Sequence, residues 1–333
     1  MIKFRELAFA LVRNSVYKRI KEPDLVIKLT GVRKRYGDLL AVDDLNLTIP
    51  KAEIYGLIGP NGAGKTTTIR MMCGLLLPTE GEVEIAGVNV CAEPERAQQH
   101  IGYLSDFFAV YDDLKVWEYL DYFAHAYKLA PESIPQRVRE VIADVGLEVK
   151  TDSLIAGLSR GMKQRLGIAR AIIHRPEVLL LDEPASGLDP KARFELRLLL
   201  QKLRDQGATV LISSHILTEL EGFCTSIGIM EKGHLVRSGR IEEVTAAASP
   251  SREVMLRWIG TAPALVDLLQ PFSEISRVRV QESAARFDFS GPDERLADVL
   301  AKLAAAQVRV ISFTEVKATV EDLYMKLSHH EVM

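Results

Sequence analysis

The stretch AEIYGLIGPNGAGKTTTIR, residues 52–70, decides the fold of this 333-residue chain. An apolar run at 54–58 predicts a short buried strand, glycines recur through 59–64, and a helix is expected to begin near Lys65. Glycines allow backbone angles that turn successive N–H groups toward a phosphate, and the start of a helix adds partial positive charge. The order of strand, glycine loop and helix therefore predicts a phosphate-binding loop in an α/β core.

This loop has the spacing GxxxxGK[ST], in which each residue type has a task. Lys65 brings a full positive charge to the terminal phosphates, Thr66 offers a hydroxyl to Mg²⁺, and Thr67 can hold another phosphate. A tight turn without a ligand is the alternative, and the flanking strand and helix argue against it. The candidate nucleotide-binding residues are Gly59, Pro60, Asn61, Gly62, Ala63, Gly64, Lys65, Thr66 and Thr67.

Two acidic residues follow a second apolar run, VLLLDEP at 178–184. Such a run predicts a buried parallel strand, and open α/β sheets bind ligands at the carboxyl ends of their strands. We expect Asp182 to hold Mg²⁺ through water and Glu183 to act as the general base toward an attacking water. A helix-capping role is the alternative for Glu183.

A histidine follows another strand-like run, ATVLIS at 208–213. His215 should therefore reach the same sheet edge, where an imidazole can hydrogen-bond the γ-phosphate or the attacking water. A structural role is the alternative for a single histidine. We expect His215 and Glu183 to share the catalytic work.

A second candidate anion site lies in LSRGMKQRLGIARA, residues 158–171. Ser159 can cap the helix that follows, and Gly161 lets the backbone approach a ligand closely. The amides at this helix start would then face outward. One chain thus carries two phosphate-binding ends.

The bulk composition is that of an ordinary globular protein with about two domains. A net charge of −3 gives no global basic field, so no nucleic-acid partner is expected. No apolar run approaches the ~20 residues that span a bilayer, and we expect a soluble chain. Residues 1–24 read as a basic amphipathic helical extension, which could dock on protein or contact a membrane surface.

With these motifs in place, the chain resembles the ATP-binding subunits of ABC transporters over about residues 25–244. The resemblance identifies 59–67 with the Walker A loop and 178–183 with the Walker B strand and its catalytic glutamate. It identifies 158–171 with the signature and His215 with the switch histidine. It adds Tyr36 as the aromatic that stacks on adenine. It also adds SGLD, residues 186–189, as the D-loop with Asp189 at the nucleotide.

The resemblance implies a fold, a partner set and a location. The fold is an α/β phosphate-loop NTPase core with an antiparallel β subdomain and a helical insert at about 101–165. In that family Ser159 and Gly161 face ATP held by another copy, so a homodimer, or a heterodimer with a homologous subunit, is implied. ATP and Mg²⁺ are the implied cofactors, and the implied partner is a separately encoded integral membrane permease. The subunit would lie on the cytoplasmic face of the cell membrane as a peripheral protein.

Two departures from the family pattern stand out. Asp106 occupies the place of the usual glutamine and can still serve as a catalytic-site and metal-binding residue, although it adds negative charge near the γ-phosphate. We expect slower hydrolysis as a result. Met162 replaces the usual glutamine of the signature, which weakens the polar network there.

The helical insert carries two groups of aromatic and apolar residues. Trp117, Tyr119, Tyr122 and Phe123 are expected mainly in the core. The loop residues Phe107, Phe108, Val110 and Tyr111 are unusually apolar, and if exposed they mark a partner surface. In the resembled family this region receives a membrane subunit.

The last part of the chain, 252–333, is predicted as a small α+β, ferredoxin-like domain after the linker TAAASPS at 245–251. Its pattern reads β-α-β-β-α-β, followed by a final helix, and we expect it to support dimerisation or regulation. Its VEDLYMKL resembles the tail of ATPase subunits that drive two-component exporters. His329 and His330 lack a third ligand for a metal.

The leading hypothesis is an ATP-hydrolysing subunit that powers a separate permease, most simply an exporter or a lipid, drug or polysaccharide mover. A soluble ABC ATPase acting on nucleic acid or ribosomes is one alternative. A weakly hydrolysing, ATP-gated binding module is another, suggested by Asp106.

Overall fold

The computed structural model describes residues 25–216, 220, 222–241, 243–244, 252–260 and 265–316. The expected N-terminal helix, the 245–251 linker, the closing helix and both terminal histidines lie outside these residues. Contacts divide the described chain into two compact units. The first holds the described residues through Val236 except 220 and 222, and the second holds those two together with everything described from Arg237 on. The predicted domain boundaries stay predictions.

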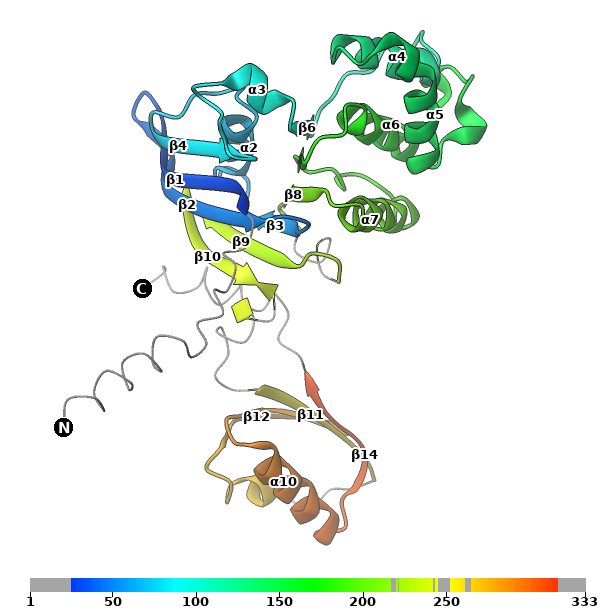
Figure 1. Ribbon diagram of the computed structural model, residues 1–333. Coiled ribbons are helices and arrows are strands. Elements are labelled where there is room, and N and C mark those ends of the chain that lie inside the picture. The colour runs from blue at the N-terminus through cyan, green and yellow to red at the C-terminus, as the bar shows by residue number, and fades with distance from the viewer. Residues whose placement is uncertain are drawn as a thin grey trace, which may run out of the picture. The chain divides into compact units, whose positions relative to one another are not determined.

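A six-stranded sheet, in the order β10-β9-β3-β8-β7-β6, forms the centre of the first unit, apart from the residues of β10 from Arg237 on (Figure 1). Its strands are β3 (Ile54–Ile58), β6 (Ile101–Leu104), β7 (Val178–Leu181), β8 (Thr209–Ser214), β9 (Ser226–Glu231) and β10 (His234–Arg240). Strand β3 pairs in parallel with β8 and β9, and β7 pairs in parallel with β6 and β8. Every residue of β3, β7 and β8 is buried, as expected for continuous apolar runs covered on both faces.

A four-stranded antiparallel sheet, in the order β2-β1-β4-β5, packs with the parallel sheet. It contains β1 (Leu25–Tyr36), β2 (Leu39–Pro50), β4 (Glu80–Ile85) and β5 (Val88–Asn89). One core cluster joins Ile27, Ile49 and Val83 of this sheet to Leu57 and Leu180 of the parallel one. Helices α2 (Lys65–Met72) and α3 (Pro94–Gln98) belong to the same part of the chain. The predicted β subdomain is confirmed.

Helices fill the sequence between β6 and β7, as predicted for the insert. They are α4 (Val116–Ala126), α5 (Ile134–Asp144) and α6 (Arg160–Ile172), with short 3₁₀ turns at Pro131–Ser133, Glu148–Lys150 and Ile155–Gly157. Helix α7 (Pro190–Asp205) follows β7. The expectation that the insert begins at Ile101 was wrong, because Ile101–Leu104 forms β6 and pairs with β7. No helix among the described residues has both the length and the apolar character needed to cross a bilayer.

The second unit has its own sheet, in the order β12-β13-β11-β14. Its elements run β11 (Arg252–Ile259), α9 (Leu265–Leu269), β12 (Ile275–Gln281), β13 (Ala284–Phe289), α10 (Asp293–Ala305) and β14 (Arg309–Val316). A separate core cluster includes Leu256, Trp258, Phe287, Phe289 and Leu303. The β-α-β-β-α-β order read from the sequence is the order observed.

The aromatic residues of α4 divide between core and surface. Tyr119 is fully buried and Phe123 is half-buried, as expected, but Trp117 and Tyr122 are exposed. Helix α4 buries only the face that packs on α5 and α6, and its other face stays open to solvent. The expectation of a core position was therefore wrong for these two residues.

The central sheet predicts a large effect for a core truncation. Leu180→Ala in β7 should lower the free energy of unfolding of the first unit by about 2–5 kcal/mol, because the side chain is fully buried. The matched control Leu77→Ala, at a 63% exposed leucine, should change it by less than about 0.5 kcal/mol. Urea unfolding measures both, and equal effects would contradict the observed packing.

Candidate functional site

The glycines of the phosphate loop are required by conformation and by space. Gly62 and Gly64 have φ of +83° and +100°, which L side chains rarely adopt, and Gly64 is the residue that precedes α2. A Cβ on Gly64 would lie 2.6 Å from the carbonyl oxygen of Ala41, and one on Gly59 would overlap the carbonyl of Met230. The loop backbone is therefore pressed against β2 and β9, which fixes its path between β3 and α2.

The side chain of Lys65, the first residue of α2, folds back into the phosphate loop that precedes it. Its side chain is 6% exposed, and Nζ donates to the carbonyl oxygens of Gly59 at 2.6 Å and Pro60 at 3.2 Å. The same Nζ lies 3.4 Å from Oε1 of Glu183. A buried ammonium held by two carbonyls and a carboxylate is a positive charge placed where the sequence predicts phosphate.

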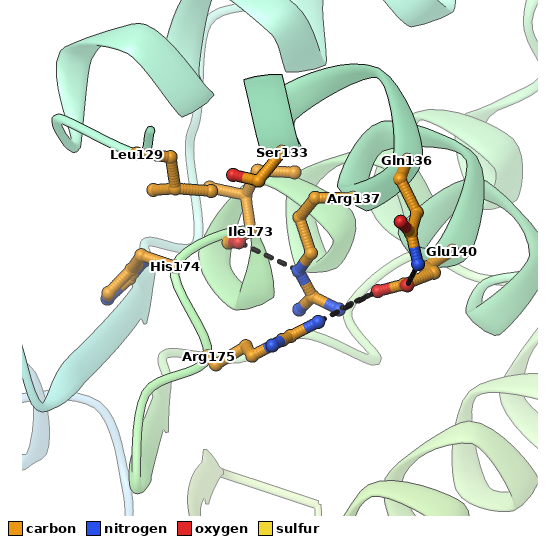
Figure 2. Close-up of a pocket in the computed structure, with 8 residues that line it drawn as sticks. All are labelled: Leu129, Ser133, Gln136, Arg137, Glu140, Ile173, His174 and Arg175. Atoms are coloured by element: carbon orange, nitrogen blue, oxygen red, sulfur yellow. Dashed lines mark hydrogen bonds and ion pairs between the residues drawn. The ribbon is translucent and has the colours of Figure 1, made fainter. Parts of the chain in front are cut away.

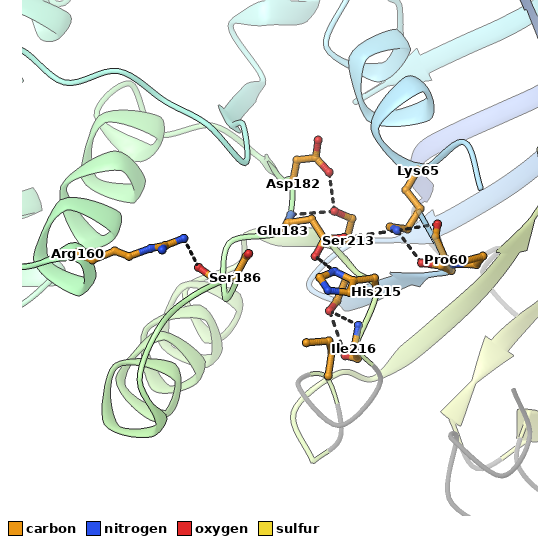
Figure 3. A network of polar contacts seen from close by, with 11 residues as sticks. Pro60, Lys65, Arg160, Asp182, Glu183, Ser186, Ser213, His215 and Ile216 are labelled. Atoms are coloured by element: carbon orange, nitrogen blue, oxygen red, sulfur yellow. Dashed lines mark hydrogen bonds and ion pairs between the residues drawn. The ribbon is translucent and has the colours of Figure 1, made fainter. Parts of the chain in front are cut away.

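The two acids after β7 are brought together by a serine of β8 (Figure 3). Asp182 is 2% exposed, and its Oδ1 accepts a 2.6 Å hydrogen bond from Oγ of Ser213. The same Oγ accepts the backbone N–H of Glu183 at 2.9 Å. Glu183 has a φ of +48°, a left-handed conformation that is uncommon for a residue with a Cβ.

His215 completes this network. Its Nδ1 lies 2.8 Å from Oε2 of Glu183, so the two oxygens of this carboxylate contact Lys65 and His215 respectively. The structure thus unites four of the predicted residues, Lys65, Asp182, Glu183 and His215, at the carboxyl edge of the sheet (Figure 3). Their chemical roles stay predictions.

The second anion site begins α6 and contacts α7. Ser159 caps α6, because its Oγ accepts the backbone N–H of Met162 at 3.3 Å. A Cβ on Gly161 would lie 3.0 Å from Cβ of Ala192, so the two helix starts touch. Asp189 caps α7 in the same way, accepting from the N–H of Ala192 at 2.9 Å.

An arginine that the sequence analysis passed over joins the signature to the D-loop. Arg160 donates from Nη2 to the carbonyl oxygen of Ser186 at 2.8 Å (Figure 3). Its guanidinium fills the space where a Cβ of Gly187 would lie, and Gly187 has a φ of +66°. We call this contact of Arg160 with Ser186 and Gly187 the clasp.

The remaining predicted site residues differ in exposure, and Ala63 of the phosphate loop is buried. Tyr36 ends β1 with 46% of its surface exposed, and Nζ of Lys34 lies 5.3 Å from its ring centroid. An accessible ring is what stacking on a base requires. Thr66 and Thr67 are half-buried in the first turn of α2, and Asn61 is exposed.

Asp106 lies in the exposed loop after β6. Loss of solvation raises the pKa of its carboxyl, and the neighbouring Asp182 and Glu183 raise it further, against the opposing effects of Arg160 and His215. This carboxyl therefore experiences the charges of the acidic pair.

The apolar loop beyond Asp106 is partly exposed. Phe107 is 88% exposed and Tyr111 is 57% exposed, whereas Val110 is half-buried. Phe108 is also half-buried, close to Gly167 and 5.8 Å from Cζ of Arg170. Two of the four predicted surface residues are thus clearly available to a partner.

The chemistry of the donors fits magnesium. Thr66 and Asp182 supply a hydroxyl and a carboxylate, the oxygen ligands that Mg²⁺ prefers. The described residues form no cluster of three or more His, Cys, Asp or Glu side chains suited to a metal. A magnesium ion here would complete its coordination with phosphate and water oxygens.

A separate pocket of about 380 Å³ lies between α5 and the end of α6 (Figure 2). Arg137 donates to the carbonyl oxygens of Ile172 and Ile173, while Glu140 accepts from Gln136, Arg137 and Arg175. These groups pair with one another and with the backbone, so the pocket is a structural cap for α6. It contains none of the predicted site residues.

Comparisons with known proteins agree with this geometry. A family model described as "ABC transporter" matches residues 42–186. The Nod factor export ATP-binding protein I of Ralstonia nicotianae is 30% identical over 307 residues, which are 92% of this chain and 95% of that protein. This chain belongs to the ABC transporter ATP-binding proteins. The predicted family, with its ABC-type ATPase fold, is confirmed.

Two further similarities show how much of this chain and of each relative is alike. The probable multidrug ABC transporter ATP-binding protein YbhF of Escherichia coli is 36% identical over 226 residues, 68% of this chain, and this chain spans only 39% of its length. A solved dimeric ATP-binding cassette with ADP and Pi bound is similar to this chain at 28% identity and a TM-score of 0.58. That similarity covers 64% of this chain and 98% of the cassette.

Sequence reasoning missed Ser213, Arg160 and Gly187. A serine inside the apolar run ATVLIS is a detectable signal, because a buried hydroxyl needs a partner. The clasp gives no such signal, since the long arginine side chain can reach in many directions.

The clasp predicts a coupling between two substitutions. Gly187→Ala should destabilise the first unit by about 1–2 kcal/mol, because alanine disfavours a positive φ, and it should also displace Arg160 from Ser186. When Arg160 is already alanine, there is no arginine to displace and only the cost of the positive φ is left. The destabilisation by Gly187→Ala should therefore shrink by roughly 0.5 kcal/mol or more. Urea unfolding of the four proteins measures this difference.

Gly207→Ala is the matched control, because Gly207 has a φ of +101° and open space where the Cβ would lie. Its effect should be the same with and without Arg160. An unchanged effect of Gly187→Ala in the two backgrounds would contradict the clasp.

Proposed function

We propose that this chain is an ATP-hydrolysing subunit that dimerises around ATP and drives a separate membrane permease, specifically an exporter. One observation carries the proposal: the carboxylate of Glu183 lies between Lys65 and His215 beside the phosphate loop. A base (Glu183), a cation for phosphate (Lys65) and an imidazole that can donate a proton (His215) would thereby be within reach of one reacting phosphate.

ATP binding would rearrange this network. Lys65 now contacts two loop carbonyls and Glu183, and the β- and γ-phosphates are stronger partners for its ammonium. When Lys65 turns to the phosphates, Glu183 loses one of its two partners. The base is then available only when the substrate is present.

Hydrolysis follows from the positions of the side chains. Glu183 accepts a proton from the attacking water, and His215 orients the Glu183 carboxylate and can donate to the γ-phosphate. Lys65 and the backbone N–H groups at the start of α2 would stabilise the charge that develops on the phosphate oxygens. Thr66 and Asp182 would hold Mg²⁺, which when bound would supply positive charge that neutralises part of this developing charge.

The dimer explains the second anion site. The start of α6 contacts the D-loop and α7, and its capping serine is exposed. We infer that Ser159 and Gly161 bind the nucleotide held by residues 59–67 of a second subunit, in a head-to-tail arrangement. A solved relative is dimeric with ADP and Pi bound, which supports dimerisation as part of this proposal. A homodimer and a heterodimer satisfy it equally.

An exporter is the partner that the relatives favour. One of them is named for Nod factor export and another as a probable multidrug transporter protein. The exposed Phe107 and Tyr111 give this chain an apolar surface for a permease. We propose a peripheral position on the cytoplasmic face of the cell membrane.

Glu183→Gln should lower ATP hydrolysis about 10²–10⁴-fold, because it removes a positioned base while keeping the shape of the side chain. The variant should also form a dimer with MgATP, as measured by light scattering after size exclusion. The matched control is Glu177→Gln, at the opposite end of β7, which should leave the rate within about twofold of the parent.

A Glu183→Gln protein that stays monomeric in saturating MgATP would contradict the proposed dimer. Parent-like hydrolysis by the same variant would remove Glu183 as the base.

Asp106→Gln should raise hydrolysis about two- to tenfold, because it removes a negative charge near the Asp182 and Glu183 carboxylates. The advantage should shrink as the pH falls, since the raised pKa of Asp106 lets the parent lose that charge by protonation. Rates of both proteins across a pH series measure the ratio. A ratio of one at all pH values would show that Asp106 does not slow the reaction.

A further inference from the structure

We propose that Ser213 is the positioning residue of the catalytic centre, fixing the magnesium-binding carboxylate and the general base with a single hydroxyl. This inference rests on the proposed ATP hydrolysis. Its starting point is the sheet register: Leu181 of β7 lies opposite Ile212 of β8 in a parallel pair. The next residue on each strand is Asp182 and Ser213, so the two side chains meet where β7 ends.

The hydroxyl of Ser213 both donates and accepts a hydrogen bond. It is 0% exposed, donates its one hydrogen to Oδ1 of Asp182 at 2.6 Å and accepts the N–H of Glu183 at 2.9 Å. A hydroxyl that donates once and accepts once has its direction set by its two partners. The carboxylate of Asp182 and the backbone of Glu183 are therefore tied to one point.

Each partner needs what Ser213 supplies. Asp182 is 2% exposed, and a buried carboxylate without a donor is strongly disfavoured. The N–H of Asp182 still bonds across to Leu104 of β6, but β7 ends before Glu183. The N–H of Glu183 is instead taken by the Ser213 hydroxyl while the residue holds its left-handed φ of +48°.

The consequence is a link between metal binding and base placement. A rotation of Ser213 would release the Asp182 carboxylate and the Glu183 backbone together, because one hydroxyl holds both. Its loss should therefore impair two functions that a merely structural serine would leave alone. Groups that orient metal ligands typically change metal affinity or activity 10–100-fold when they are removed.

The test uses the full-length chain. Ser213→Ala should lower kcat about 10–100-fold, with a smaller change in KM for ATP. Independently of turnover, it should weaken Mn²⁺ binding in the presence of ADP about tenfold or more, measured by electron paramagnetic resonance. Ser213→Thr keeps the hydroxyl and should recover most of both losses.

Thr209→Val is the matched control at the other end of β8. Thr209 is also 0% exposed, and its Oγ1 accepts a backbone N–H, from Ala52 at 2.9 Å. The control should lower the melting temperature to a similar extent and leave kcat and Mn²⁺ binding near those of the parent. If Ser213→Ala behaves like this control, the positioning role is overturned.

Two further outcomes are decisive. If Ser213→Ala does not fold, Ser213→Cys takes its place, and a weak S–H donor should give a clear partial loss of kcat and Mn²⁺ affinity. Parent-like values for the cysteine variant overturn the proposal. If the parent itself hydrolyses no ATP, the proposed function fails, while the Mn²⁺ measurement still tests what Ser213 does for Asp182.

Discussion

The catalytic centre depends on placing two carboxylates next to each other at the end of a buried strand. Neighbouring acids repel, and burial removes the water that would screen them. The fold compensates with a donor from the adjacent strand, Ser213, and with two cationic or proton-bearing side chains, Lys65 and His215. Ser213 and His215 come from the carboxyl end of β8 and the residue just after it, and Lys65 is the first residue of α2, the helix that follows the phosphate loop after β3. The parallel register of β3, β7 and β8 is thus what makes the acidic pair tolerable.

The same compensation connects substrate binding to catalysis. A lysine that neutralises Glu183 in this arrangement is the lysine that a triphosphate would claim. The phosphate loop can hold Lys65 this way because Gly59 and Gly64 press its backbone against neighbouring carbonyls, which leaves the loop little freedom to move. In the proposed reaction the closely packed loop would keep its path, and the lysine side chain would be the part that changes partner.

Much of this was accessible from the sequence, for identifiable physical reasons. The phosphate loop is determined by local sequence, since glycine conformation and the charge at a helix start act within a few residues. The strands were predictable because they are continuous apolar runs. The predictions that were wrong concerned features that depend on packing between segments distant in the sequence. Strand β6 is only four residues long and is a strand because β7 lies beside it, and Trp117 is exposed because α4 has neighbours on one face only. Ser213 and the clasp needed three-dimensional register, which spacing along the chain does not contain.

The clasp gives the proposed dimer a mechanical property. Arg160 stands within the signature and holds the D-loop carbonyl of Ser186, while Gly161 touches Ala192 in the first turn of α7. The start of α6 is therefore connected to the D-loop by a polar contact and to the start of α7 by a steric one. Ser159 and Asp189 cap these two helices, so both caps lie at this junction. In the proposed head-to-tail pair, a movement of this junction would reach Glu183 through the backbone, because the N–H of Ser186 donates to the carbonyl oxygen of Glu183 at 3.1 Å.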